Sequence, residues 1–207
     1  WMAPLLTEAS GSLSDVGMRR VPVFFSLLTL LLGLTAFRRY GAGAALLWGL
    51  VFAMAPLSVI YGSYFVQEVM LTCFTLAFLV AVYRYWHGPS WWKAAAAGTS
   101  LGLMHVTKET AVLHVAAICV AGIMVAWVRK EGARTSPREL LKHAGLAAAI
   151  VALLHCLFFS SFFANPQGMV DGLTAYFSYA ERSQGAGHEK PFFFYLDFLQ
   201  LFIWSVK

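Results

Sequence analysis

The sequence is dominated by long apolar runs that are separated only by short polar gaps. The runs occupy residues 21–37, 44–60, 69–83, 94–106, 111–128 and 144–163, and a further run begins at residue 192. A helix that spans a bilayer needs about 20 predominantly apolar residues. The runs do not alternate apolar with polar residues, as the strands of a membrane barrel would. We therefore expect an all-α, polytopic transmembrane helix bundle with about seven spans visible, the last one truncated.

The composition excludes a water-soluble domain. Hydrophobic residues make up 59% of the 207 residues and charged residues only 12%, whereas soluble domains contain about 25% charged residues. The formal net charge of +5 does not indicate a nucleic-acid partner, because the basic residues lie in the gaps between apolar runs, as in membrane proteins. The chain starts at Trp1 and stops just inside an apolar run. We expect residues 1–207 to be one transmembrane domain, cut from a longer protein.

The positions of Lys and Arg predict which gaps face the cytoplasm, because cytoplasmic loops carry an excess of these residues. The basic gaps contain Arg38, Arg39, Arg84, Lys93, Arg129, Lys130, Arg134, Arg138 and Lys142. Residues 1–20, 61–68, 107–110 and 164–191 should then face outward. Most acidic residues fall on that outer face. Either a working surface or simply longer and more polar outer loops would explain this excess.

Gln67 and Glu68 lie where an outer gap passes into an apolar run, with Tyr61 and Tyr64 close by in the sequence. A charged group at membrane depth costs about 2.5–3.5 kcal/mol on insertion scales. This cost favours a role for Glu68 in binding or in a polar network. A carboxylate at a helix N-terminus is stabilised by about 0.3–1 kcal/mol, so simple helix capping is the alternative.

The segment 107–110 leaves almost no loop between two apolar runs, so Lys108 and Glu109 must lie close to the membrane surface. Lys108 is suited to an anionic group such as a lipid phosphate, and Glu109 to a basic partner or a metal ion. Solvated charges in a plain turn are the alternative. Arg19 and Arg20 precede the first run on the face that should be poor in positive charge. They indicate an anionic partner, unless they only snorkel to the interface.

The remaining polar residues predict structure more than chemistry. The cysteines lie inside apolar runs without metal-ligand spacing, so no disulfide framework and no metal site are expected. His105 and His155 are expected to be core histidines. Gly98 and Gly102 form a small-xxx-small pattern that lets two helices approach closely. Residues 169–182 are expected to form an interfacial amphipathic helix within the outer loop 164–191.

Several short motifs follow one another along this chain in the same order as in one known superfamily. The motifs are residues 15–22, Ala55-Pro56, Tyr61-Gly62-Ser63, Gln67-Glu68, Thr107-Lys108-Glu109-Thr110 and residues 159–168. Together they resemble the polytopic GT-C glycosyltransferases, which include protein mannosyltransferases and lipid A aminoarabinose transferases. The closest likeness is to the flippase-activity-associated family of archaeal-type glycosylation.

The resemblance implies transfer of a hexosyl or pentosyl group from a polyprenyl-phosphate donor to a protein, lipid or glycan acceptor. It places the enzyme among membrane lipids, in a prokaryotic plasma membrane with the active face outward. It puts the catalytic aspartate upstream of residue 1, in a first outer loop that ends within residues 1–20. No cofactor is certain, although a divalent metal fits the family. A lipid-linked sugar flippase or transport-associated protein without glycosyl transfer is the alternative, and a structural subunit of an envelope complex is a third.

The resemblance also assigns roles to individual residues. Arg20 and Lys108 would hold the donor phosphate, and Glu68 and Glu109 would order the site. Gln67 and Tyr61 complete the predicted substrate-binding set. At Tyr64 and Gln67, where the family often has arginine, this chain carries no basic residue.

Overall fold

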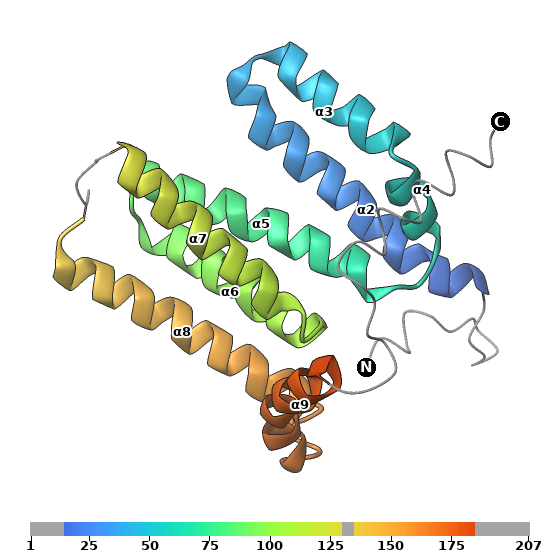
Figure 1. The fold of residues 1–207 in the computed structure, drawn as a ribbon, viewed down its shortest axis with the longest axis vertical. Coiled ribbons are helices and arrows are strands. Elements are labelled where there is room, and N and C mark those ends of the chain that lie inside the picture. Colours follow the sequence, from blue (N-terminus) through green and yellow to red (C-terminus); the bar gives the residue numbers. More distant parts are fainter. Residues whose placement is uncertain (1–14, 130–134, 185–207) are drawn as a thin grey trace. The chain divides into compact units, whose positions relative to one another are not determined.

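Every regular element of the described chain is a helix. The structure is a computed structural model that describes residues 15–129 and 135–184 (Figure 1). It divides into two compact units, Trp1–Gly172 and Leu173–Lys207. The helices are α2 (Asp15–Phe37), the short 3₁₀ helix η1 (Arg38–Tyr40), α3 (Ala42–Met54), α4 (Pro56–Ser63), α5 (Gln67–His87), α6 (Trp91–Thr107), α7 (Ala111–Arg129), α8 (Pro137–Phe159) and α9 (Gln167–Gln184).

Several of these helices are long and apolar enough to cross a membrane. Four qualify, namely Gly17–Tyr40, α5, Ala111–Val128 and α8, and α3 with α4 makes a fifth if the bent pair counts as one span. Helix α6 has 17 residues, about 26 Å at 1.5 Å per residue, slightly less than the roughly 30 Å hydrocarbon core. The predicted all-α membrane bundle is confirmed. The last predicted span, from residue 192, lies outside the described residues.

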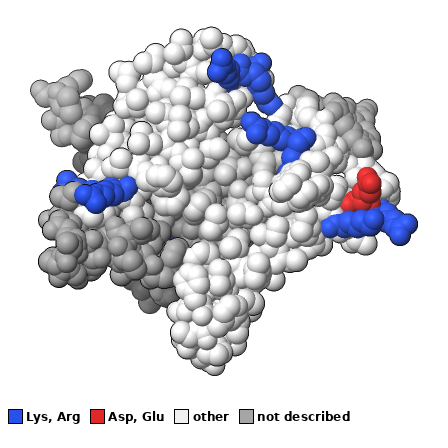
Figure 2. All heavy atoms as spheres, turned by 180° about the vertical axis from the view of Figure 1, so that it is seen from behind, with Lys and Arg blue, Asp and Glu red and all other residues white. Residues whose placement is uncertain are grey.

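The outer surface of these helices is apolar, as lipid requires. Large side chains such as Leu31, Ile123 and Leu141 are exposed. On the face in Figure 2, Lys, Arg, Asp and Glu form a few small groups and most of the described surface is uncharged. A surface of this kind is stable against acyl chains and not in water.

The predicted span over residues 44–60 is broken, which corrects the expectation of one continuous helix. Helices α3 and α4 meet at an angle of 61°. Proline disfavours the helical conformation of the residue before it, and Ala55 is extended, with φ −65° and ψ 120°. Pro56 then occupies the first position of α4, where its missing N–H costs nothing.

The predicted basic loop before residue 144 is also shorter than expected, because α8 begins at Pro137. The Ser136 side chain accepts a hydrogen bond from the backbone N–H of Glu139 at 3.3 Å, and Glu139 lies in the first turn. A serine cap, proline at the start and an early acidic residue together favour helix initiation here.

Helix α6 packs between α5 and α8 in the first unit. A Cβ atom at Gly98 would lie 2.7 Å from Cα of Ala147, and one at Gly102 would lie 2.6 Å from Cδ1 of Leu154. The close approach predicted from the small-xxx-small pattern is therefore confirmed, with α8 as the partner. On the other side of α6, Met104 is fully buried against α5 and α7.

Helix α2 packs against α3, α4 and α5, with the rings of Phe25 and Phe74 5.4 Å apart. The end of α4 lies against α2, because a Cβ atom at Gly62 would lie 2.9 Å from Oγ of Ser26. We call the end of the bundle at which α5 begins and α6 ends the Glu68 end, and the end at which α5 finishes the Arg84 end. Helix α9 covers the segment expected to be helical; its position at the membrane interface remains a prediction.

Candidate functional site

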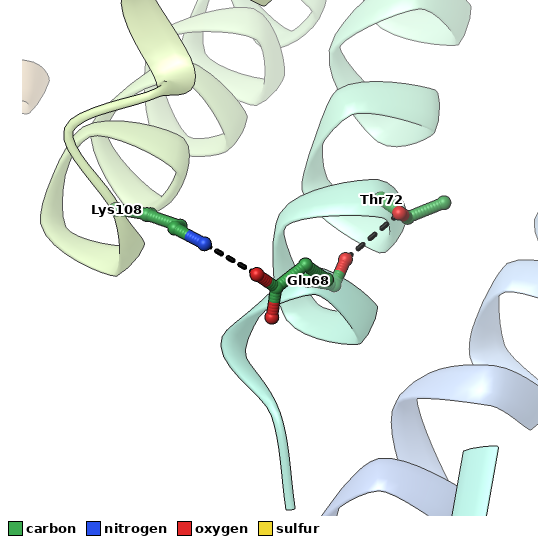
Figure 3. A network of polar contacts seen from close by, with 3 residues as sticks. All are labelled: Glu68, Thr72 and Lys108. Atoms are coloured by element: carbon green, nitrogen blue, oxygen red, sulfur yellow. Dashed lines mark hydrogen bonds and ion pairs between the residues drawn. The ribbon is translucent and has the colours of Figure 1, made fainter. Parts of the chain in front are cut away.

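An ion pair joins the two predicted outer gaps at the Glu68 end. Glu68 lies in the first turn of α5, which follows the extended residue Val66. Lys108 ends α6 in an extended conformation, with φ −160° and ψ 143°. Its Nζ donates a hydrogen bond to Oε1 of Glu68 (Figure 3). The pair links the start of α5 to the end of α6.

Both partners of this pair remain accessible. The side chain of Lys108 is 27% exposed and that of Glu68 is 48% exposed. The backbone oxygen of Glu68 accepts a hydrogen bond from Oγ1 of Thr72 at 2.8 Å, one turn further along α5 (Figure 3). Glu68 is therefore part of a polar network as well as an acidic residue at a helix N-terminus. A role for Glu68 in binding remains a prediction.

A cavity of about 290 Å³ opens beside Glu68. Its wall combines apolar side chains with one carboxylate and several hydroxyl groups. The lining residues are Ser26, Thr29, Phe52, Leu57, Ser58, Tyr61, Gly62, Glu68, Val69 and Thr72. Small-molecule sites typically begin at about 300 Å³ and combine apolar walls with a few polar groups. The cavity is mostly apolar with a few polar groups, and it has room for a small group or for part of a larger ligand.

The bend between α3 and α4 brings hydroxyl groups to this cavity. Leu57, Ser58 and Tyr61 all belong to α4, which turns away from α3 at Ala55. No hydrogen bond to another described residue engages the hydroxyl of Ser58 or Tyr61. These groups are free to donate to a ligand.

The other candidate residues are not joined to this network. Arg20 and Gln67 are exposed and Glu109 is half-buried. None of the three forms an ion pair within the described chain, and none lines the cavity beside Glu68. The structure thus brings together Tyr61, Glu68 and Lys108, and leaves Arg20, Gln67 and Glu109 outside the contacts that connect them.

The described residues offer no evident ligand set for a divalent metal. No group of three or more His, Cys, Asp or Glu side chains comes close enough to hold a metal ion in the part of the chain described. Glu109, for which a metal was considered, is therefore not part of such a group among the described residues. The catalytic aspartate that the family resemblance implies was expected upstream of residue 1, and its position remains a prediction.

A histidine pair connects α6 to α8. Nε2 of His105 lies 2.8 Å from Nδ1 of His155, and Nε2 of His155 lies 2.9 Å from the backbone oxygen of Met169. A carbonyl oxygen only accepts, so Nε2 of His155 must carry a proton. Neutral His155 then accepts at Nδ1, and His105 donates from Nε2. The ring of Phe159 packs against both imidazoles.

The pairing of these histidines was not predictable from their spacing. They are 50 positions apart, and the sequence indicated only that each is a polar residue within an apolar run. The expectation that each is a satisfied core histidine agrees with the observed hydrogen bonds. His114 is satisfied in the same way, with Nδ1 3.1 Å from Oγ1 of Thr75.

The comparisons identify the family. A profile described as dolichyl-phosphate-mannose-protein mannosyltransferase matches residues 1–162. No curated protein and no solved structure matches the chain. The matched range includes the ion pair, the cavity and the His105–His155 contact. It confirms the resemblance to the GT-C superfamily of membrane glycosyltransferases, while the narrower likeness to the archaeal-type family remains a prediction. The chain belongs to the dolichyl-phosphate-mannose-protein mannosyltransferase family.

Proposed function

We propose that this chain forms the donor-binding part of a glycosyltransferase that uses a sugar linked to polyprenyl phosphate. The acceptor is a protein, lipid or glycan on the non-cytoplasmic face of a prokaryotic plasma membrane. The observation that carries the proposal is the Glu68–Lys108 ion pair beside a hydroxyl-lined cavity at one end of a membrane helix bundle. That combination offers separate partners for a phosphate, a sugar and a lipid tail.

Lys108 is the proposed partner of the donor phosphate. Its ammonium group has three donors, and Glu68 engages one of them. The side chain is partly exposed and lies where α6 ends, close to the membrane surface. The phosphodiester of such a donor carries one negative charge, which Lys108 can meet without separating from Glu68.

Glu68 is proposed to hold Lys108 in place and to accept from the sugar. Oε1 of Glu68 receives the hydrogen bond from Lys108, which leaves Oε2 for a hydroxyl group of the donor. Ser58 and Tyr61, which also line the cavity, supply further hydrogen-bond partners. A hexose presents hydroxyl groups in several directions, and a wall with hydroxyl and carboxylate groups satisfies them.

The attraction between Lys108 and the donor phosphate grows as the reaction proceeds, because negative charge accumulates on the phosphate. The bond between the anomeric carbon and the phosphate oxygen breaks, and a bond from the acceptor oxygen to the anomeric carbon forms. The leaving polyprenyl phosphate then gains a second negative charge, which a nearby ammonium stabilises most strongly in the transition state. The acceptor proton goes to a carboxylate acting as general base, proposed to be an aspartate outside this chain. Arg20 is proposed as a second cation and Glu109 as an ordering residue.

The test of Lys108 uses the full-length protein in proteoliposomes with a radiolabelled polyprenyl-phosphate sugar. Removing one electrostatic donor to a developing charge typically lowers kcat by about 100- to 1,000-fold. Lys108→Ala should therefore lower kcat by about 100-fold and weaken the apparent donor affinity. Lys142→Ala is the matched control, because Lys142 is an exposed lysine on α8. Unchanged kcat and donor affinity in Lys108→Ala would remove the assignment.

Glu68→Gln tests the second residue of the pair. The amide keeps the size of the side chain and loses the charge that holds Lys108. If Glu68 were only a favourable residue at a helix N-terminus, activity would stay near normal. We expect instead that kcat falls while the protein remains folded, as judged by its elution in size-exclusion chromatography. Near-normal turnover by Glu68→Gln would leave helix capping as its role.

A further inference from the structure

We propose that the Arg84 end of the bundle carries a second lipid site, which binds an anionic glycerophospholipid. Arg39 and Arg84 would hold the phosphate of the headgroup, and an apolar groove beside them would hold an acyl chain. The proposal rests on two adjoining cavities and on the charges around them. It is independent of the function proposed for the Glu68 end.

The first cavity is basic and aromatic. It has a volume of about 430 Å³ and lies between the end of α2, η1 and the end of α5. Arg39, Tyr40, Tyr83 and Arg84 supply its polar groups. Neither arginine forms an ion pair with a carboxylate anywhere in the described ranges. Two uncompensated guanidinium groups that face one cavity favour an anionic ligand.

Arg39 is already held in one orientation. Its Cζ lies 3.5 Å from the ring centroid of Tyr83 and 4.5 Å from that of Tyr40. One N–H group donates to the hydroxyl of Tyr40. A guanidinium that rests on an aromatic face keeps donors free along its edge, and the five donors of arginine leave several for a phosphate. The Arg39 side chain is thus already ordered in the free protein, so binding a ligand costs little further conformational entropy at this residue.

The second cavity indicates a lipid and not a free phosphate. It has a volume of about 310 Å³, lies between α5 and α7, and shares Leu79 and Tyr83 with the basic cavity. Its other lining is mostly apolar and includes Ile118 and Val125. It also includes Gly122, where an added Cβ would meet no atom within 4 Å. An acyl chain would make favourable apolar contacts in this space, whereas inorganic phosphate would not.

This site is distant from the Glu68 end. Sixteen positions of α5 separate Glu68 from Arg84, which corresponds to about 24 Å along the helix. The residues 38, 39 and 84 belong to the gaps predicted to face the cytoplasm, and basic pockets between membrane helices on that side recruit anionic headgroups. A lipid bound here would therefore occupy the opposite leaflet from the proposed sugar donor.

The test measures lipid retention by the full-length protein with native mass spectrometry. Detergent-purified protein is incubated with phosphatidylglycerol or with phosphatidylcholine at equal concentration. We expect phosphatidylglycerol to be retained at least tenfold better, and the double variant Arg39→Gln/Arg84→Gln to lose that preference. Arg138→Gln is the control, because Arg138 is an exposed arginine on α8. Equal retention of both lipids by the unmodified protein would overturn the proposal.

Further measurements distinguish a lipid from a free phosphate, and loss of lipid binding from misfolding of the arginine variant. Gly122→Leu fills the apolar groove without touching an arginine, so it should reduce phosphatidylglycerol retention severalfold. Excess glycerol 3-phosphate should compete poorly. If soluble glycerol 3-phosphate displaces the lipid fully and Gly122→Leu has no effect, the site binds phosphate alone and the lipid proposal is wrong.

The variant Arg39→Lys tests the stacking on Tyr83, because lysine keeps the charge and loses the planar group. We expect intermediate retention of phosphatidylglycerol, and full retention would contradict the role given to that stacking.

Discussion

The contact between α6 and α8 gives the sharpest prediction about the fold. A Cβ atom at Gly98 would lie 2.7 Å from Cα of Ala147, instead of the 3.4 Å at which ordinary contact begins, a shortfall of about 0.7 Å. The obstructing atoms at 2.7 and 2.9 Å belong to the backbone of Ala147, so no side-chain rotation relieves them. Gly98→Ala must therefore move the two helices apart.

The expected cost follows from two opposing terms. Overpacking of a well-packed contact costs about 1–3 kcal/mol, while Gly→Ala in a helix gains about 0.5–1 kcal/mol. Gly98→Ala should lower the free energy of unfolding by up to about 2.5 kcal/mol, and by about 1–3 kcal/mol relative to a Gly→Ala variant without the clash. Gly122→Ala and Gly145→Ala are matched controls, because no atom lies within 4 Å of a Cβ at either position. These controls should be neutral or slightly stabilising.

The assay is unfolding of the full-length protein by sodium dodecyl sulfate in mixed micelles, followed by circular dichroism. The comparison is between Gly98→Ala and the two control variants, so the common gain in helix propensity cancels. If Gly98→Ala unfolds at the same detergent fraction as Gly122→Ala, the backbone approach of α6 to α8 is not as close as described. The same assay applied to Gly102→Ala should also show a loss, since Leu154 meets that position.

Two predictions concern the segment that follows α8. His155→Phe removes the hydrogen bond to the Met169 carbonyl and the contact with His105, and a typical hydrogen bond contributes about 0.5–1.5 kcal/mol. Hydrogen exchange at Met169 and its neighbours should therefore accelerate, and unchanged exchange would refute the role of His155. Gly168→Ala would place a Cβ 2.0 Å from the carbonyl oxygen of Phe159, so it should destabilise the protein at least as much as Gly98→Ala. Limited proteolysis of this segment checks it, and cleavage no faster than in the unmodified protein would contradict the geometry.

Long apolar runs with turn residues between them predicted much of the fold. Hydropathy located most of the long helices that the structure describes, because a backbone in lipid must satisfy its hydrogen bonds internally, whereas α9 was expected from its amphipathic pattern. The glycine spacing at Gly98 and Gly102 also predicted a close helix contact, although the partner helix was not predictable. The break at Ala55 was not expected, since the apolar run continues through it while Pro56 restricts the backbone.

The candidate site was only partly predictable. Glu68 and Lys108 were chosen separately, each because a charge near an apolar run is costly. Their pairing depends on the antiparallel packing of α5 and α6, which no local pattern specifies. The His105–His155 contact is similar, because it requires the register between α6 and α8. Tyr61 reaches the cavity only because α4 bends away from α3.

The sequence indicated the basic cavity at the Arg84 end only through an excess of basic residues. Charge bias predicted on which side Arg39 and Arg84 should lie. It did not predict that the guanidinium of Arg39 rests on Tyr83, because that contact joins η1 to the last turns of α5. The arginines that predict the topology are therefore also the arginines of the proposed lipid site.

The most direct test of the proposed function follows a doubly labelled donor in proteoliposomes that contain the full-length protein. The polyprenyl chain carries one label and the sugar carries another, and a panel of sugars is tried with endogenous acceptors. We predict that the sugar label leaves the lipid and becomes covalently attached to an acceptor on the side of the membrane at which the Glu68 end lies. Movement of the intact doubly labelled lipid across the bilayer, with no new glycosidic bond, would contradict the proposal and favour a transport protein.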